Sequence, residues 1–170
     1  DNVLDGIMSK INIIGNTAAT SNDEIVTGLE KSSAAMALMG SSLEENIALF
    51  TAGQEIIQND SQVGNALRSI SMRIRGYDEE TEELSDDLVN IKGEVVDLTK
   101  TADNPNGTSL FTDANQTEYK DIYEYLGEIS DIYDDLSAKN QQSLIEKLFG
   151  KNKASVGSAI IKNFDAARKA

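Results

Sequence analysis

The sequence predicts a mainly α-helical protein: a multi-helix array of about seven to eight helices, with a small β-hairpin or β-bridge near residues 95–112. Three observations support this prediction. Apolar residues recur at steps of three and four along most of the chain, which is the period of an amphipathic helix. Serine, asparagine or aspartate precedes several of these stretches, and glycine follows them. The single proline falls in a dense turn signal between two short β-prone runs.

The N-terminal part of the sequence has the pattern of three helices. The first covers residues 3–14, where the apolar positions follow a helical period. Ser21–Glu24 has the serine and the glutamate of a capping box, and the second helix runs from there to Gly40. Ser41 or Ser42 caps the third helix. The apolar positions of the third helix are Leu43, Ile47, Phe50, Ile56 and Ile57.

A fourth predicted helix is rich in arginine. Asp60 or Ser61 caps it, and Gly76 stops it. Its apolar stripe consists of Val63, Leu67, Ile70 and Ile74. The candidate interaction residues, taken to be exposed, are Arg68, Met72, Arg73 and Arg75. The arginines are either solubilising charges that pair one turn away, or guanidinium groups that reach carboxylates or a partner surface.

An acidic segment and a predicted β excursion follow. Residues 78–87 contain seven acidic side chains and no basic one, which predicts an exposed turn or the flank of a helix. Two β-prone runs, residues 95–98 and 110–112, lie on either side of the turn sequence Asp103–Gly107. We expect a small hairpin here. Because the connection is long for a hairpin, a loop with one β-bridge is the alternative.

The last part of the chain predicts three more helices. A heptad-like seam indicates a helix of about five turns over residues 119–136. The seam residues are Tyr119, Ile122, Leu126, Ile129, Tyr133 and Leu136. This seam either packs inside the domain or associates with another copy. A short helix closed by Gly150 and a final amphipathic helix over residues 156–164 complete the array.

The composition excludes most common catalytic groups. Cysteine and histidine are absent, which excludes disulfides, thiol nucleophiles, Cys/His zinc sites and histidine bases. Nucleotide-binding and serine-hydrolase motifs are missing, and residues 103–113 depart from the calcium-loop pattern. We therefore expect no catalytic, cofactor-binding or metal-binding residues and no enzyme activity. No apolar run approaches the ~20 residues of a membrane span, and the start within a helical pattern suggests a piece of a longer protein.

The net charge of -14 is unevenly distributed. Residues 1–76 carry a net charge of -4, residues 77–136 carry -15, and residues 137–170 carry +5. Phosphate binding depends on Lys and Arg, so an acidic surface of this kind is not expected to bind nucleic acid directly. The basic end either folds back on the acidic middle or contacts another copy.

The arginine-rich run Val63–Gly76 resembles the VGTALRTISMRLRG segment of tail tape-measure proteins of long-tailed phages and prophages. Asn65 stands where this family usually has Thr, and Phe149 stands where it usually has Ala. Four further segments follow the family's order and resemble its LDESIALITA, NxVVQDP, AGKRQGN and LLSNFDIA sequences. These segments are Ser42–Leu49, Gly53–Ser61, Gly150–Lys153 and Ile160–Ala167.

The resemblance implies a structural phage tail assembly protein. Tape-measure proteins are long, helix-rich chains that occupy the lumen of the growing tail, set its length, and template polymerisation of tail-tube subunits. They leave the tube during infection so that DNA can pass. The implied partners are tail-tube and other tail or baseplate proteins, tail assembly chaperones and other copies of the chain. The implied location is the tail lumen of the virion, and the host cytoplasm during assembly, with no membrane contact by this fragment.

On this interpretation residues 1–170 form a single tape-measure core module. Its sub-parts are helical residues 1–76, an acidic connection with the β excursion over residues 77–118, and helical residues 119–170. The residues themselves also allow a different class of protein, a helical adaptor or signalling module that recognises a partner helix in a groove. A cytosolic regulator as the specific partner would favour that alternative.

Overall fold

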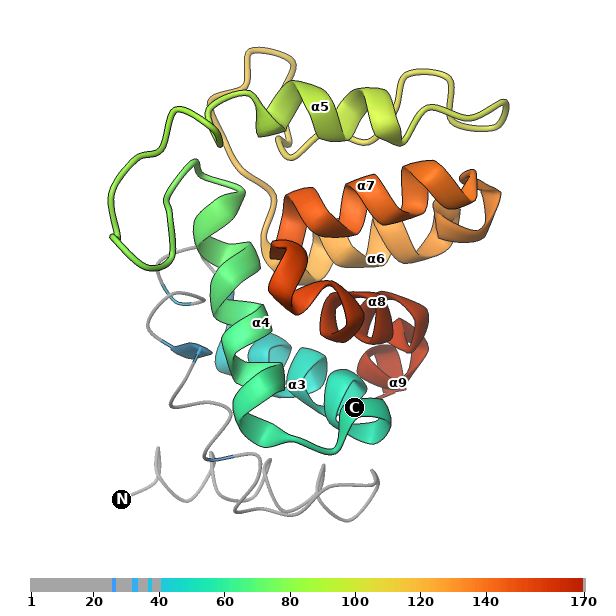
Figure 1. Cartoon of the computed structure of the whole chain (residues 1–170). Helices are drawn as coiled ribbons and strands as arrows, with labels where there is room; N and C mark the ends of the chain where they lie inside the picture. Colours follow the sequence, from blue (N-terminus) through green and yellow to red (C-terminus); the bar gives the residue numbers. More distant parts are fainter. Residues whose placement is uncertain (1–25, 27–31, 34–36, 38–40, 170) are drawn as a thin grey trace.

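The computed structural model describes residues 26, 32, 33, 37 and 41–169. The helices predicted over residues 3–14 and 21–40 lie largely outside the described residues. Residues 41–169 form seven α-helices and two short 3-10 helices, so the prediction of a mainly helical array is confirmed (Figure 1). The elements are α3 (Leu43–Ile57), α4 (Asp60–Arg73), α5 (Ile91–Leu98), α6 (Ile122–Ile132), η1 (Tyr133–Asp135), α7 (Ala138–Phe149), η2 (Lys151–Lys153), α8 (Ala154–Lys162) and α9 (Phe164–Lys169).

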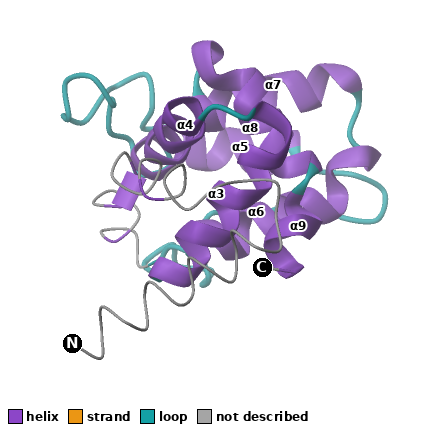
Figure 2. Cartoon of the chain, turned by 90° about the horizontal axis from the view of Figure 1, so that it is seen from below, coloured by secondary structure: helices purple, strands orange, loops and turns teal. Residues whose placement is uncertain are grey.

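The helices pack around one core. α3 contacts α4, α8 and α9, so the first and last helices of the continuous described stretch lie side by side. α4 leads from α3 towards α7, and α5 lies on the far side of α7 from α3 (Figure 1). Figure 2 shows helices joined by loops, with no strand in the described part of the chain. Five helices contribute the largest buried side chains, among them Phe50, Leu67, Tyr125, Phe149 and Phe164.

α3 is the central helix because its middle has no charged residue. All nine residues from Asn46 to Gln54 are buried, which is the pattern of a helix enclosed on every side. Its N-cap is Ser42, which forms a complete capping box with Glu45. Of the two predicted caps, Ser41 and Ser42, the second is therefore correct. Gly53 allows α4 and α8 to approach, since a Cβ there would lie 2.8 Å from Val63 Cγ1.

α4 buries the predicted apolar stripe. Val63, Leu67 and Ile70 are fully buried, and Ile74 follows the last helical residue. The predicted cap was wrong by one or two positions, because the side chain of Asn59 accepts the N–H of Gln62 at 3.0 Å. The helix ends at Arg73, and Gly76 adopts a positive φ of 87° three residues later.

The predicted hairpin near residues 95–112 is wrong. Of the alternative, a loop with one bridge, a bridge from Phe111 is present, but its partner lies outside the two β-prone runs. Residues 95–98 belong to α5, because Ile91 and Val95 are buried on one face of the helix, next to α7. Burial of that face outweighs the β preference of adjacent valines. Phe111 forms an isolated antiparallel bridge with Tyr119.

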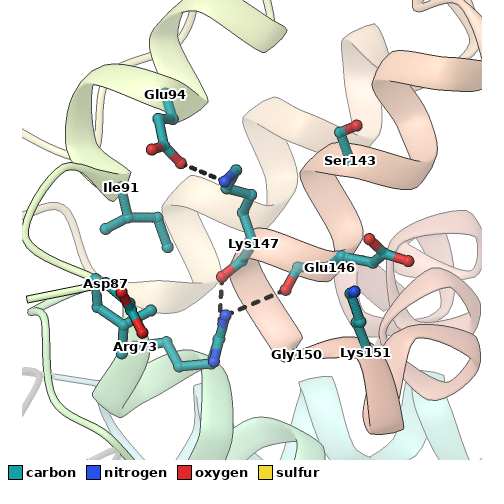
Figure 3. Close-up of a pocket in the computed structure, with 10 residues that line it drawn as sticks. Arg73, Asp87, Ile91, Glu94, Ser143, Glu146, Lys147, Gly150 and Lys151 are labelled. Carbon is teal, nitrogen blue, oxygen red and sulfur yellow. Dashed lines mark hydrogen bonds and ion pairs between the residues drawn. The ribbon is translucent and has the colours of Figure 1, made fainter. Parts of the chain in front are cut away.

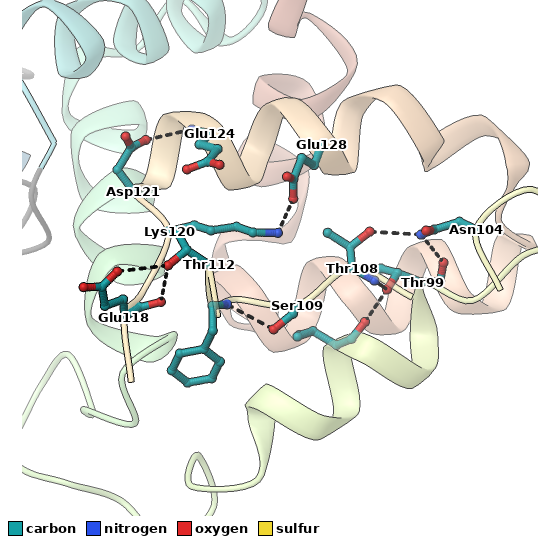
Figure 4. A network of polar contacts seen from close by, with 12 residues as sticks. Thr99, Asn104, Thr108, Ser109, Thr112, Glu118, Lys120, Asp121, Glu124 and Glu128 are labelled. Carbon is teal, nitrogen blue, oxygen red and sulfur yellow. Dashed lines mark hydrogen bonds and ion pairs between the residues drawn. The ribbon is translucent and has the colours of Figure 1, made fainter. Parts of the chain in front are cut away.

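The loop after α5 is held by polar contacts (Figure 4). The hydroxyl of Thr99 accepts the N–H of Thr108 at 2.7 Å. The amide of Asn104 donates to the Thr99 carbonyl and to the Thr108 hydroxyl, at 3.1 and 3.0 Å. Gly107, with φ +71°, is required, since a Cβ there would lie 2.1 Å from the Val96 carbonyl oxygen. These bonds satisfy the backbone at the end of α5 without a partner strand.

The predicted seam over residues 119–136 packs inside the domain. Its members from Ile122 to Leu136 are buried, and Tyr119 is partly buried against the same core. The helix is shorter than predicted, because α6 begins after the N-cap Asp121 and changes to the 3-10 helix η1 at Tyr133. The seam is therefore occupied by the chain's own helices.

The C-terminal region forms two helices after α7, where one was predicted. α7 ends before Gly150, as expected. α8 and α9 are separated at Asn163, whose amide donates to the Ala52 carbonyl and to the Glu55 carboxylate on α3, both at 2.9 Å. The break therefore attaches the end of the chain to the central helix.

Candidate functional site

The candidate interaction residues lie in the last two turns of α4 and immediately after it. Arg68, Met72, Arg73 and Arg75 are each partly buried, so the expectation of exposed positions was wrong. The Met72 carbonyl accepts the N–H groups of Arg75 and Tyr77, at 3.2 and 3.1 Å, and so closes the end of the helix. The three guanidinium groups reach three different parts of the domain.

Arg73 joins α4 to the C-terminal end of α7 (Figure 3). Its Nε donates to the carbonyl of Lys147 at 3.0 Å, and its Nη2 donates to the carbonyl of Glu146 at 3.2 Å. Carbonyls in the last turn of a helix lack partners within the helix and carry a partial negative charge. The guanidinium group also lies beside Gly150, 3.6 Å from the position of a Cβ there. Arg73 therefore supplies a donor to the Lys147 carbonyl and a second donor to the Glu146 carbonyl, which also accepts the N–H of Gly150.

Arg68 holds the acidic loop between α4 and α5. Its Nη1 donates to the carbonyl of Glu79 at 2.9 Å, and its Nη2 lies 3.1 Å from the Glu82 carboxylate. On the same loop, the Glu79 carboxylate pairs with Lys153 of η2 at 2.8 Å. The N–H groups of Thr81 and Glu80 donate to the Asp78 carboxylate and hold the pKa of that carboxyl below its usual value. The loop is an exposed turn, as predicted, but one with fixed contacts.

Arg75 stacks on an aromatic pair. Its guanidinium carbon lies 4.5 Å from the centre of the Tyr119 ring, which is cation–π geometry. The Tyr119 and Phe111 rings are themselves 4.5 Å apart. Arg75 thus connects the end of α4 to the segment that leads into α6.

A polar hollow of about 390 Å³ opens beside Arg73, between the end of α4, α5 and α7 (Figure 3). Its lining residues are Arg73, Asp87, Leu88, Ile91, Glu94, Ser143, Glu146, Lys147, Gly150 and Lys151. Lys147 and Glu94 pair across it at 2.6 Å. A second hollow of about 170 Å³ lies beyond Arg75, and Ile74, Val89 and Tyr119 are among the residues that line it.

Ion pairs join the basic end of the chain to its acidic middle. Lys147 pairs with Glu94, Lys153 with Glu79, and Arg168 with Asp131 at 2.8 Å. Of the two alternatives for the basic end, folding back within the chain is therefore confirmed. Contacts with Asp131 and Asp165 also raise the pKa of Arg168.

Sequence reasoning found the arginines and missed their partners. The partners of Arg73 are main-chain carbonyls, which every residue has, so no sequence signal marks them. The partners of Arg68 lie in the acidic run, where charge complementarity was a usable signal. Tyr119 was assigned to the seam, and its role under Arg75 was not anticipated.

The described residues contain neither a cluster of metal ligands nor a membrane-spanning helix. No group of three or more Asp and Glu side chains there is placed to hold a metal ion. Among the same residues, no helix combines the length and the apolar character needed to cross a membrane.

The fold and the site together define a helical structural module whose arginines join its own segments. Residues 2–150 match the family model described as phage-related minor tail protein. Since this match covers most of the chain, the chain belongs to the phage-related minor tail protein family, whose members are structural components of phage tails. Nothing matched in the comparisons with curated proteins and with solved structures.

Proposed function

We propose that this chain is the core module of a tail tape-measure protein, which sets tail length and templates polymerisation of the tail tube. The observation that carries the proposal is the run Val63–Gly76. It resembles the tape-measure segment, and it forms α4 with the turn after it, in a chain that belongs to the minor tail family. In the fold this run is the junction to which α7, the acidic loop and Tyr119 attach.

The proposal also covers where the module acts, which proteins it contacts, and which residues belong to it. The module occupies the tail lumen of the virion, and the host cytoplasm during assembly. Its partners are tail-tube and other tail or baseplate proteins, assembly chaperones and other copies. Residues 1–170 act as one module, which is supported by the single hydrophobic cluster of the described part. The proposed role includes no direct binding of nucleic acid, because residues 77–136 carry a net charge of -15 and repel the phosphate backbone.

The four candidate residues contribute to these contacts. Arg73 lines the larger hollow and Arg75 lines the smaller one, each with part of its side chain accessible. Arg68 acts by fixing the acidic loop, and Met72 lies partly accessible on the same helix. No catalytic role is proposed, and incubation with peptidoglycan should release nothing.

The decisive experiment changes the length of the parent gene. In-frame deletions outside residues 1–170 should shorten the tail in proportion, by about 1.5 Å per residue where the measuring chain is helical. Electron microscopy of particles from the producing bacterium measures this directly. The matched control removes the same number of codons from another tail gene, which should not rescale the tail. Normal tails of unchanged length after several deletions would contradict the proposal.

A further inference from the structure

Three large apolar side chains are exposed in the segment between α4 and α5. Tyr77, Leu84 and Val89 have exposed fractions of 38%, 67% and 47%. Single exposed apolar residues are common on protein surfaces, but several that adjoin one another mark an interaction site.

Tyr77 and Leu84 adjoin each other beside Gly76, and Val89 lines a hollow that Gly76 also lines. Tyr77 and Leu84 form an antiparallel bridge, which places directly opposed side chains on the same face. Leu84 Cδ2 lies 3.7 Å from the position that a Cβ of Gly76 would take. Gly76 and Val89 both line the hollow of about 170 Å³, with Ile74 and Tyr119. We call Tyr77, Leu84, Val89 and this hollow the loop patch.

The loop patch is held in place before any partner arrives. Arg68 binds the loop through Glu79 and Glu82, and Lys153 binds Glu79 from η2. The bridge is flanked by the hydrogen bond from the Asp78 N–H to the Glu83 carbonyl, at 2.9 Å. A surface fixed in this way loses little conformational entropy on binding.

The loop beside the hollow is acidic, whereas Arg75 and Lys92 line the hollow itself. Residues 78–87 hold seven carboxylates, and Glu79 and Glu82 are the ones paired with Arg68 or Lys153. Within residues 41–169, Glu80, Glu83 and Asp86 are exposed and have no cationic partner. An apolar surface with a carboxylate rim complements a segment in which Lys or Arg flanks apolar side chains.

We propose that the loop patch docks a basic, apolar segment of a different protein. One apolar side chain of that segment enters the hollow beside Val89, and its Lys or Arg residues face the carboxylates of the loop. A second copy of this chain fits less well, because each copy carries a net charge of -14 and two copies repel each other. Of the seven basic side chains in residues 137–170, Lys147, Lys153 and Arg168 already pair internally. The identification of the partner as a tail component rests on the proposed function, whereas the docking surface does not.

Site-specific photo-cross-linking in the full-length parent protein, in the producing bacterium, tests this proposal. p-Benzoylphenylalanine is placed at position 84 or 89 and, as a matched control, at position 56. Ile56 is an exposed apolar residue of α3, 58% accessible and outside the loop patch. Mass spectrometry identifies the cross-linked peptides.

Positions 84 and 89 should both cross-link to the same segment of one other protein, and that segment should contain Lys or Arg among apolar residues. Position 56 should not yield this product. The proposal is overturned by any of four results: no cross-link to another protein, a cross-link to a copy of this chain or to the chain itself, a target segment without basic residues, or the same product from position 56.

A second part of the experiment reverses the charge of two loop carboxylates. Glu80→Lys with Glu83→Lys should reduce the cross-link from position 84 by about tenfold or more, since two attractions become repulsions. Asp134→Lys with Asp135→Lys makes the same charge change at exposed positions on η1 and should leave the yield unchanged. Circular dichroism confirms that both variants are folded. Equal yields from the two variants would overturn the proposal. A basic partner that is not a tail protein would preserve the docking surface and contradict the tail role.

Discussion

The Nε of Arg73 lies 3.0 Å from the carbonyl oxygen of Lys147, 74 positions further along the chain. This hydrogen bond joins the end of α4 to the end of α7, and a second bond to the Glu146 carbonyl strengthens it. The Arg73 side chain thus links the C-terminal ends of α4 and α7 through these two bonds. The guanidinium group of Arg73 is charged and presents its N–H donors in a planar fork. The ammonium group of a lysine cannot reach both carbonyls with the same geometry.

Replacing this arginine should weaken the domain. Arg73→Ala should lower the free energy of unfolding by about 1.5–3 kcal/mol, the range for hydrogen bonds made by charged groups. Arg73→Lys should recover part of the loss. Urea-induced unfolding followed by circular dichroism measures both, with Lys139→Ala, at an exposed position of α7, as the control. An Arg73→Ala variant as stable as this control would show that the bonds are not stabilising.

Two glycine substitutions should have opposite signs. Gly157→Ala places a Cβ 2.3 Å from Phe149 Cδ2, so it should lower the free energy of unfolding by about 1–3 kcal/mol. At Gly93, in the exposed part of α5, a Cβ meets nothing within 4 Å. Gly93→Ala should therefore stabilise the helix by about 0.5–1 kcal/mol. Thermal unfolding distinguishes the two, and a shift of equal sign in both variants would contradict the packing of α8 on α7.

The buried stripe of α4 should be sensitive to truncation. Leu67→Ala should cost about 2–5 kcal/mol, because the side chain is fully buried and leaves a cavity. Ile56→Ala removes a similar side chain from an exposed position and should change stability by at most about 0.5 kcal/mol. Equilibrium unfolding in urea compares them. Similar losses in the two variants would be inconsistent with the observed orientation of α4.

The carboxylate of Asp113 should make stability depend on pH. The Thr117 hydroxyl and the N–H groups of Glu118 and Thr117 donate to the carboxylate and lower its pKa below the ordinary 3.8. A carboxyl whose pKa is lower in the folded state stabilises fully above 3.8, and this contribution disappears as the pH falls through the folded value.

Asp113→Asn keeps one acceptor oxygen and removes the charge, so it isolates this effect. The wild-type protein should be the more stable of the two at neutral pH, and the difference should shrink as the pH falls below 3.8. Denaturation curves at a series of pH values provide the measurement. Asp78, whose pKa is lowered in the same direction, is present in both proteins and cancels in the comparison. A difference independent of pH would contradict the assignment.

Local patterns were sufficient for much of the helical framework. The Ser42 capping box, the stripe from Val63 to Ile70 and the stop at Gly150 all depend on neighbours in the sequence, and all are present. Residues 95–98 were misassigned because two adjacent valines favour a strand, and their burial in a helix is decided by α7, more than 40 positions away.

The contacts of the candidate site were harder to foresee. A stripe of apolar residues indicates which face of α4 is buried, but it does not identify the segment that reaches Arg73 or Arg75. Those contacts depend on the crossing of α4 with α7 and on the return of the chain through Tyr119. The pairing of Tyr77 with Leu84 in an isolated bridge is likewise a contact that no periodic pattern indicates.

The contact between α3 and α9 has a consequence under the proposed tape-measure role. A continuous helix over residues 43–169 would be roughly 190 Å long. A compact domain of the same number of residues has a radius of gyration of about 14 Å. Because α3 and α9 lie side by side, residues 43–169 fold back on themselves and span far less than this helical length. Under the proposed role, opening the module would lengthen the ruler without adding a single residue.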